Sequence, residues 1–143
     1  MENSTEASFT ADSLIQDSRL HLETAVSFAN QKMSKTSLSY AAKAARLLLE
    51  AYYMKERNAL PLKGPGYEAA LLQTASDNGQ LPLTDELLLR TVWYVSEHYD
   101  YVLPHSPKPG QILNLLAKLT GLQERIEAAL SREKIHLRSR PSS

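Results

Sequence analysis

Cysteine, long apolar runs and an excess of either charge are all absent from this chain of 143 residues. Without cysteine the chain can form neither a disulfide framework nor a thiolate metal site. No run of about 18 apolar residues occurs, so we expect no segment that spans a membrane. The 16 Lys and Arg residues equal the 16 Asp and Glu residues. No overall charge therefore attracts the chain to nucleic acid or to a membrane surface.

Targeting features are also missing at the beginning of the sequence. Residues 1–6, MENSTE, are polar and acidic, without the basic and apolar stretches of a secretory signal. We therefore expect a soluble, cytoplasmic protein, and the length fits a single domain. The composition predicts a disordered segment over residues 1–11, a helical domain over 12–132 and a basic, flexible tail over 133–143.

Apolar residues recur with helical spacing through most of the remaining sequence. A first helix, capped by Asp12 or Ser13, is expected to bury one stripe of side chains: Ile15, Leu22, Val26, Ala29 and Met33. New caps over residues 34–37 begin a second helix, over about residues 37–58, with a similar stripe: Leu38, Ala41, Ala45, Leu48 and Tyr52. The alanines of this second helix allow a neighbouring helix to approach closely.

Two prolines and two glycines over residues 59–66 indicate a loop after the second helix. A short helix over 67–76 should end at Asp77-Asn78-Gly79, and a fourth helix should begin with Thr84 as its cap. A proline-rich turn over 101–109 precedes a last helix over about 111–132. The prediction is an all-α fold, an antiparallel up-and-down bundle of four long helices and one short helix.

Motifs for several common chemistries are absent. The segment Gly64-Pro65-Gly66 follows a helix and lacks the strand–loop–helix setting of a phosphate loop, and no Gly-x-Ser-x-Gly nucleophile elbow occurs. No two of the four histidines have the spacing that places two imidazoles on one helical face. We therefore predict neither a metal nor a cofactor.

Basic residues gather between residues 35 and 63, where Lys43 and Arg46 are among six cations against only two carboxylates. Three tyrosines are interleaved with them, a combination that proteins use to contact RNA. The commoner origin of this pattern is a solvated helix face with its tyrosines in the core.

The order of these features over residues 14–132 resembles the HEPN family of small helical-bundle proteins. The resemblance lies in the alanine-rich segment YAAKAARLLLEA at 40–51, the segment GYEAALL at 66–72, and the turn YDYVLPHSP at 99–107. It implies a homodimer that pairs with a nucleotidyltransferase, as in toxin–antitoxin systems, or that binds a nucleotide or RNA between its helices.

Nuclease members of that family carry an Arg, four to six residues and then a His near the end of the fourth helix. Here Arg90 and His98 have seven residues between them. Eight helical positions correspond to a rise of about 12 Å and a rotation about 80° beyond two turns. The first hypothesis is therefore a non-catalytic binding module.

Two alternatives remain open. One is a metal-independent endoribonuclease that uses Arg90, His98 and His105 in a non-standard arrangement. The other is a purely structural interaction bundle. For either binding or catalysis, the predicted site surrounds the turn after the fourth helix and adjoins the second helix, with the ligand-contacting candidates Lys43, Arg46, Tyr94, Tyr99 and Tyr101.

Overall fold

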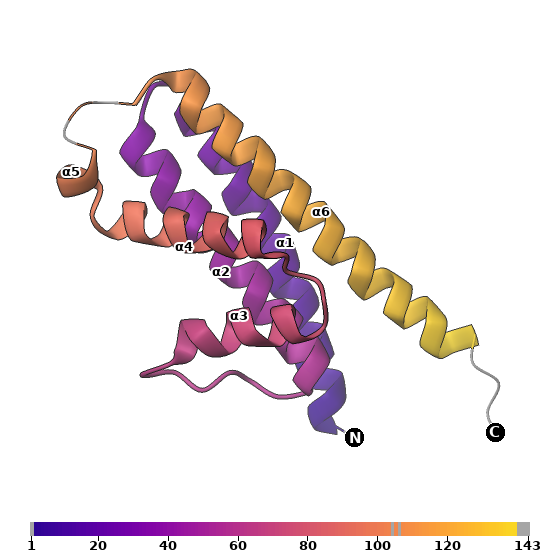
Figure 1. The fold of residues 1–143 in the computed structure, drawn as a ribbon. Coiled ribbons are helices and arrows are strands. Elements are labelled where there is room, and N and C mark those ends of the chain that lie inside the picture. Colours follow the sequence, from indigo (N-terminus) through magenta and orange to yellow (C-terminus); the bar gives the residue numbers. More distant parts are fainter. Residues whose placement is uncertain (1, 104, 106, 140–143) are drawn as a thin grey trace.

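The computed structural model describes residues 2–103, 105 and 107–139, and this part of the chain is helical with no strand (Figure 1). The helices are α1 (Glu2–Asn30), α2 (Ser34–Arg57), α3 (Tyr67–Asp77), α4 (Leu83–Glu97), α5 (Tyr99–Val102) and α6 (Pro109–Ser139). The prediction of an all-α fold is confirmed. The additional short helix α5 begins at Tyr99, before the turn predicted over 101–109, and includes the first two residues of that turn.

Helix α2 is the centre of the structure, because it packs against α1, α3, α4 and α6. Helices α1 and α2 lie side by side and run in opposite directions, and α6 packs against both (Figure 1). Helices α3 and α4 lie across α2 rather than alongside it (Figure 1). The arrangement is thus a three-helix layer of α1, α2 and α6, crossed by two shorter helices.

Small residues allow α1 and α2 to pack closely. The predicted stripe of α2 is confirmed, since all five of its members are buried. Two buried hydroxyls add hydrogen bonds across this contact: Ser18 Oγ donates to the carbonyl oxygen of Ala44 and Ser37 Oγ to that of Ala25, both at 2.7 Å. Ser37, predicted to cap α2, is therefore an interhelical donor, and α2 begins three residues earlier.

The ends of the helical region differ from the prediction. Helix α1 includes residues 2–11, for which the sequence predicted disorder, and Asp12 and Ser13 are inside it. This segment contains neither proline nor glycine, and Ala11 is buried against Ala51 and Met54 of α2. Helix α6 continues to Ser139, beyond the predicted end at residue 132, and residues 140–143 of the predicted tail lie outside the described residues.

Two predicted helix signals have different outcomes. Gly79 ends α3 as predicted, with a φ of 71°. Its amide and that of Gln80 donate to the carbonyls of Ser76 and Ala75, which is the Schellman arrangement. Thr84 is not the cap of α4, because the helix begins at Leu83 after Pro82 and has no side-chain cap.

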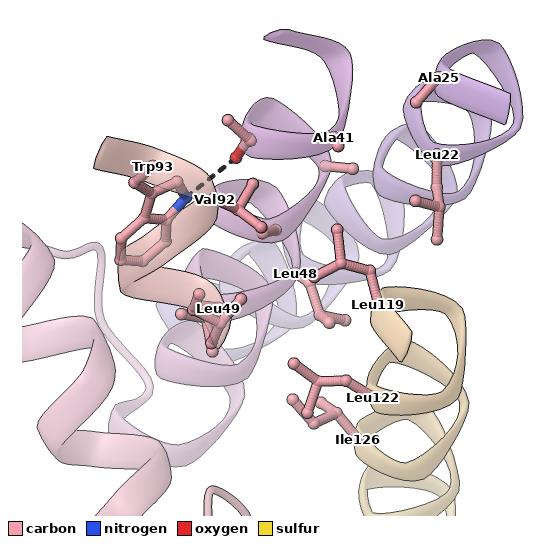
Figure 2. Packing of buried hydrophobic residues seen from close by; sticks show 14 of the residues in the cluster. Leu22, Ala25, Ala41, Leu48, Leu49, Val92, Trp93, Leu119, Leu122 and Ile126 are labelled. Carbon is pink, nitrogen blue, oxygen red and sulfur yellow. Dashed lines mark hydrogen bonds between the residues drawn. The ribbon is translucent and has the colours of Figure 1, made fainter. Parts of the chain in front are cut away.

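One continuous apolar core joins α1, α2, α4 and α6 (Figure 2). Leu48 and Leu49 of α2 lie at its centre, Val92 and Trp93 enter from α4, and α6 contributes a stripe of its own: Ile112, Leu116, Leu119, Leu122 and Ile126. The core fixes α4 on one side of α2 and α6 on the other. This arrangement sets which polar residues of α2 and α4 face each other.

Candidate functional site

A groove of about 460 Å³ lies on the surface between α2 and α4. Its lining comes from α2, from α4 and from Lys63 of the loop between α2 and α3: Ser39, Ala42, Lys43, Arg46, Leu47, Glu50, Lys63, Trp93, Ser96 and Glu97. Because α4 crosses α2, polar residues from successive turns of α2 line the groove beside the end of α4. The groove contains both cationic residues of α2 that the sequence assigned to a ligand site.

The indole of Trp93 forms the floor of the groove. Trp93 is only 4% exposed, and its Nε1 donates a hydrogen bond of 3.1 Å to the carbonyl oxygen of Ala42. The guanidinium carbon of Arg46 lies 5.9 Å from the centre of the ring, within cation–π range. The Trp93 ring is thus covered and cannot stack on a ligand.

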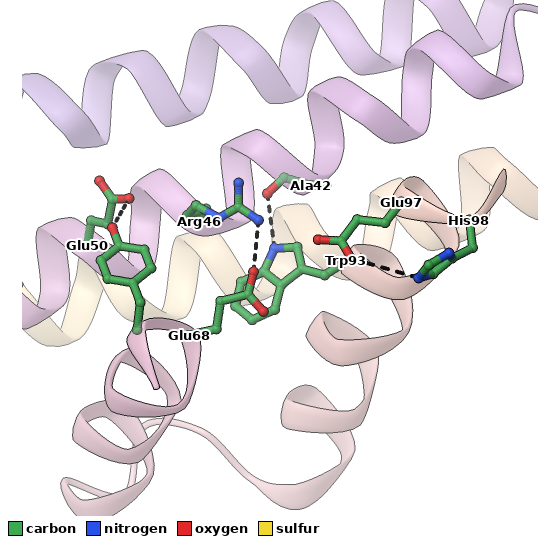
Figure 3. Close-up of polar contacts among 8 residues, drawn as sticks. Ala42, Arg46, Glu50, Glu68, Trp93, Glu97 and His98 are labelled. Atoms are coloured by element: carbon green, nitrogen blue, oxygen red, sulfur yellow. Dashed lines mark hydrogen bonds and ion pairs between the residues drawn. The ribbon is translucent and has the colours of Figure 1, made fainter. Parts of the chain in front are cut away.

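Helix α3 positions two polar side chains beside the groove. Glu68, in its first turn, accepts a hydrogen bond of 2.9 Å from Arg46 Nη2. The hydroxyl of Tyr67 donates to the carboxylate of Glu50 (Figure 3). These two contacts connect the start of α3 to one face of α2 and orient Arg46 and Glu50.

The environment of Tyr67 keeps its phenol protonated. Burial of the hydroxyl raises its pKa above the ordinary value of 10.0, and the hydrogen bond to the Glu50 carboxylate raises it further. Glu50 accepts this hydrogen bond as an anion, so a phenolate at Tyr67 would face a like charge. Lys63 Nζ lies 4.9 Å from the centre of the Tyr67 ring.

Two lysines of the groove have no acidic partner. Within the described part of the chain, neither Lys43 nor Lys63 forms an ion pair. Arg46 forms an ion pair with Glu68, and Glu50 accepts a hydrogen bond from Tyr67. The groove therefore offers two ammonium groups and two serine hydroxyls to a ligand, with Glu97 as the carboxylate on its α4 side.

The remaining predicted site residues lie outside this groove. On α4, Arg90 pairs with Glu86 at 3.2 Å, one turn away on the exposed surface. The rings of Tyr94 and His98 contact each other, with their centres 4.7 Å apart, and His98 Nε2 lies 4.0 Å from a carboxylate oxygen of Glu97. Arg90, Tyr94 and His98 are spaced four residues apart, and His98 directly follows the last residue of α4.

The turn after α4 does not gather its candidates into one cluster. Tyr99 packs against the core, Tyr101 is 86% exposed and His105 is exposed. Among the described residues, no hydrogen bond, ion pair or ring contact joins Arg90, His98 and His105. The structure thus assembles the binding candidates Lys43 and Arg46, but it shows no contact between the catalytic candidates.

Lys63 and Trp93 are among the groove residues that were not predicted as part of a site. Lys63 is in the proline- and glycine-rich loop, and only its charge marked it in the sequence. Trp93 is apolar apart from its indole N–H, and it was not among the ligand-contacting candidates named from the sequence. Both reach the groove because of the angle at which α3 and α4 cross α2.

Within the part of the chain that the structure describes, no cluster of histidine, aspartate and glutamate could hold a metal ion. None of its helices is long and apolar enough to span a bilayer. Neither a family model nor a curated protein nor a solved structure matches this chain.

Proposed function

We propose that this protein is a non-catalytic binding module that holds a phosphate-bearing ligand, a nucleotide or RNA, in the groove between α2 and α4. The observation that carries the proposal is the pair Lys43 and Lys63, two ammonium groups in one groove without acidic partners in the described structure. Lysine ammonium groups bind phosphate as compact point charges. The hydroxyls of Ser39 and Ser96 can donate to further phosphate oxygens.

The groove favours recognition through phosphate rather than through a base. The aromatic residue of the groove, Trp93, is buried beneath Arg46, and its N–H donates a hydrogen bond to the carbonyl oxygen of Ala42. Base-specific contact in single-stranded RNA relies on exposed aromatic faces for stacking. We therefore expect weak preference among bases and a strong dependence of affinity on salt.

The order of helices supports the same function through the resemblance to the HEPN family. An alanine-rich second helix, a short third helix, a fourth helix with a tyrosine- and proline-bearing turn, and a long final helix occur here in that order. Members of that family bind nucleotide or RNA in a groove between helices. In this chain the groove that such a ligand would use is the one between α2 and α4.

Fluorescence anisotropy with a labelled single-stranded RNA tests the proposal. Replacing Lys43 and Lys63 together by Ala should weaken binding by about tenfold. The slope of log K against log salt should fall by about 0.7 for each lysine that contacts a phosphate. Lys118→Ala is the matched control, because Lys118 is also exposed and unpaired in the described structure but lies on α6.

A competition experiment shows which part of the ligand the groove recognises. Pyrophosphate and ADP should displace the RNA, whereas adenosine should not, because it carries no phosphate. Binding that is unchanged in the double variant, or lost equally in Lys118→Ala, would refute the groove as the phosphate site.

A second candidate function is protein binding, which one feature of α4 favours. Leu83, Leu87 and Tyr94 are more than half exposed and share one face of the helix by their spacing. The resemblance implies a nucleotidyltransferase or a second copy of this chain as the partner. Co-purification with a nucleotidyltransferase encoded beside this gene, and light scattering for the homodimer, test the two partners. Leu87→Ser should abolish either association, and Leu62→Ser in the exposed loop serves as the control.

A further inference from the structure

Three aromatic rings from α1 and α2 form a row, called here the aromatic row. The ring centre of Tyr40 on α2 is 5.7 Å from that of His21 and 5.5 Å from that of Phe28, both on α1. His21 and Phe28 are seven positions apart, which corresponds to about two turns and a rise of about 10.5 Å. The two ring distances together are close to this rise, so Tyr40 lies between the other two rings.

The outer rings of the aromatic row are not part of the apolar core. In the described structure Tyr40 packs against that core, whereas Phe28 does not, and all three rings are partly exposed. The Tyr40 and Phe28 rings are nearly parallel, with 14° between their planes. His21 Nδ1 donates a hydrogen bond of 2.7 Å to the carbonyl oxygen of Asp17, which fixes the imidazole. The aromatic row is therefore an ordered surface on which a further planar group can stack.

The aromatic row adjoins the groove between α2 and α4. Tyr40 directly follows Ser39, which lines that groove, and it precedes Lys43 by three positions. Residues three positions apart are neighbours on the surface of a helix. A phosphate held by Lys43 therefore brings the adjoining part of the same ligand to the aromatic row.

The combination of rings and charge suits a nucleic acid. Unpaired RNA bases stack on Phe, Tyr and His side chains, and each base of the chain is joined to a phosphate. Lys43, beside the rings, has no ion pair among the described residues. An apolar protein surface over the rings would leave this ammonium group without a counter-charge as it lost water, which costs free energy. A nucleotide chain supplies both a base for the rings and a phosphate for the lysine.

We propose that the aromatic row is a stacking platform for a base of single-stranded RNA whose phosphate is held by Lys43. This inference rests on the proposed function of the groove and extends it to the base. Stacking on aromatic rings adds affinity for any base, because every base has a π-face. The platform therefore strengthens RNA binding without strong preference among bases.

Fluorescence anisotropy of the full chain with a labelled oligoadenylate tests the proposal. His21→Gln and Phe28→Leu each remove one ring, and each should weaken RNA binding by about fivefold. Pyrophosphate, which has no base, should bind both variants as it binds the wild type. Tyr94→Leu is the matched control, because Tyr94 also contacts a histidine ring but is on the exposed face of α4, and it should leave RNA binding unchanged.

Two modified RNAs examine the stacking itself. The emission of 2-aminopurine in place of adenine falls when the base stacks, so binding to the wild type should quench it more than binding to Phe28→Leu. An abasic RNA with the same backbone should bind the wild type and Phe28→Leu with equal affinity. An abasic RNA that still distinguishes the two proteins would overturn the platform.

The outcomes separate this inference from the function on which it rests. Unchanged RNA affinity in both ring variants, with pyrophosphate still bound, would overturn the platform and leave the phosphate groove in place. A wild type that binds neither pyrophosphate nor RNA would refute the groove and the platform together. Equal loss of RNA and pyrophosphate binding in the ring variants would also overturn the platform, since the rings would then only support the groove. Circular dichroism of each variant checks that it folds.

Discussion

The indole nitrogen of Trp93 on α4 donates its hydrogen bond to the main-chain oxygen of Ala42 on α2, at 3.1 Å and across 51 positions of sequence. This bond is buried beside the central core, and the guanidinium carbon of Arg46 lies 5.9 Å from the centre of the same indole ring. The same Trp93 side chain thus fixes the position of α4 on α2 and forms the floor of the groove. The stability of the fold and the shape of the groove therefore depend on the same side chain.

Trp93→Phe should lower the free energy of unfolding by about 1–2 kcal/mol, because it removes the hydrogen bond and leaves part of the indole volume empty. Urea denaturation followed by circular dichroism measures the change. Tyr94→Phe is the control on the exposed face of the same helix, and it should change stability by less than about 0.5 kcal/mol. Equal effects of the two substitutions would show that Trp93 does not anchor α4.

Two glycines in different conformations should respond oppositely to alanine. Gly79 has a φ of 71°, and a side chain there would meet no other atom, so Gly79→Ala should cost about 1–2 kcal/mol through the backbone alone. Gly121 is inside α6 with a negative φ and equally open space, so Gly121→Ala should stabilise by up to about 1 kcal/mol. Thermal unfolding measures both. A stabilising Gly79→Ala would contradict the left-handed end of α3.

Tyr67 should make stability fall at high pH. Its folded pKa is raised above the unfolded value of 10.0, so the folded state keeps the proton that the unfolded state loses. The stabilisation is fully present below pH 10 and is lost as the pH rises above that value. Tyr67→Phe should make the decline between pH 10 and 11 less steep in urea denaturation. An identical pH dependence in wild type and variant would show that the phenol does not contribute.

RNA incubated with the purified protein and EDTA should stay intact, and His98→Ala should change nothing. Arg90 is engaged by Glu86, and it precedes His98 by eight positions, which corresponds to a helical rise of about 12 Å. Gel electrophoresis of a labelled RNA detects any cleavage. Metal-independent cleavage by the wild type that disappears in His98→Ala would instead establish the nuclease alternative.

The sequence predicted the local features of this fold because each depends on residues a few positions apart. The stripe of α2, the end of α3 at Gly79 and the all-helical class follow from helical period and backbone conformation. The predictions were weaker at helix ends. There, the burial of Ala11 against α2 extended α1 beyond the cap expected at Asp12.

Two residues of the candidate groove were also predicted from the sequence. Lys43 and Arg46 were named as ligand contacts because their charges lie among tyrosines of one helix. Lys63 and Trp93 were not, since their places depend on contacts with a helix distant in the chain. The predicted grouping of Arg90, His98 and His105 is not seen as a contact among the described residues.

The amino-acid sequence by itself thus determined that the chain is helical and which face of α2 is buried, because hydrogen bonds within a helix and apolar spacing act over about four residues. The tertiary structure decided how α3 and α4 cross α2. That crossing pairs Arg46 with Glu68, 22 positions away, places Trp93 beneath Arg46, and leaves Lys43 and Lys63 in one groove. Such contacts depend on packing angles between helices, which no local pattern specifies.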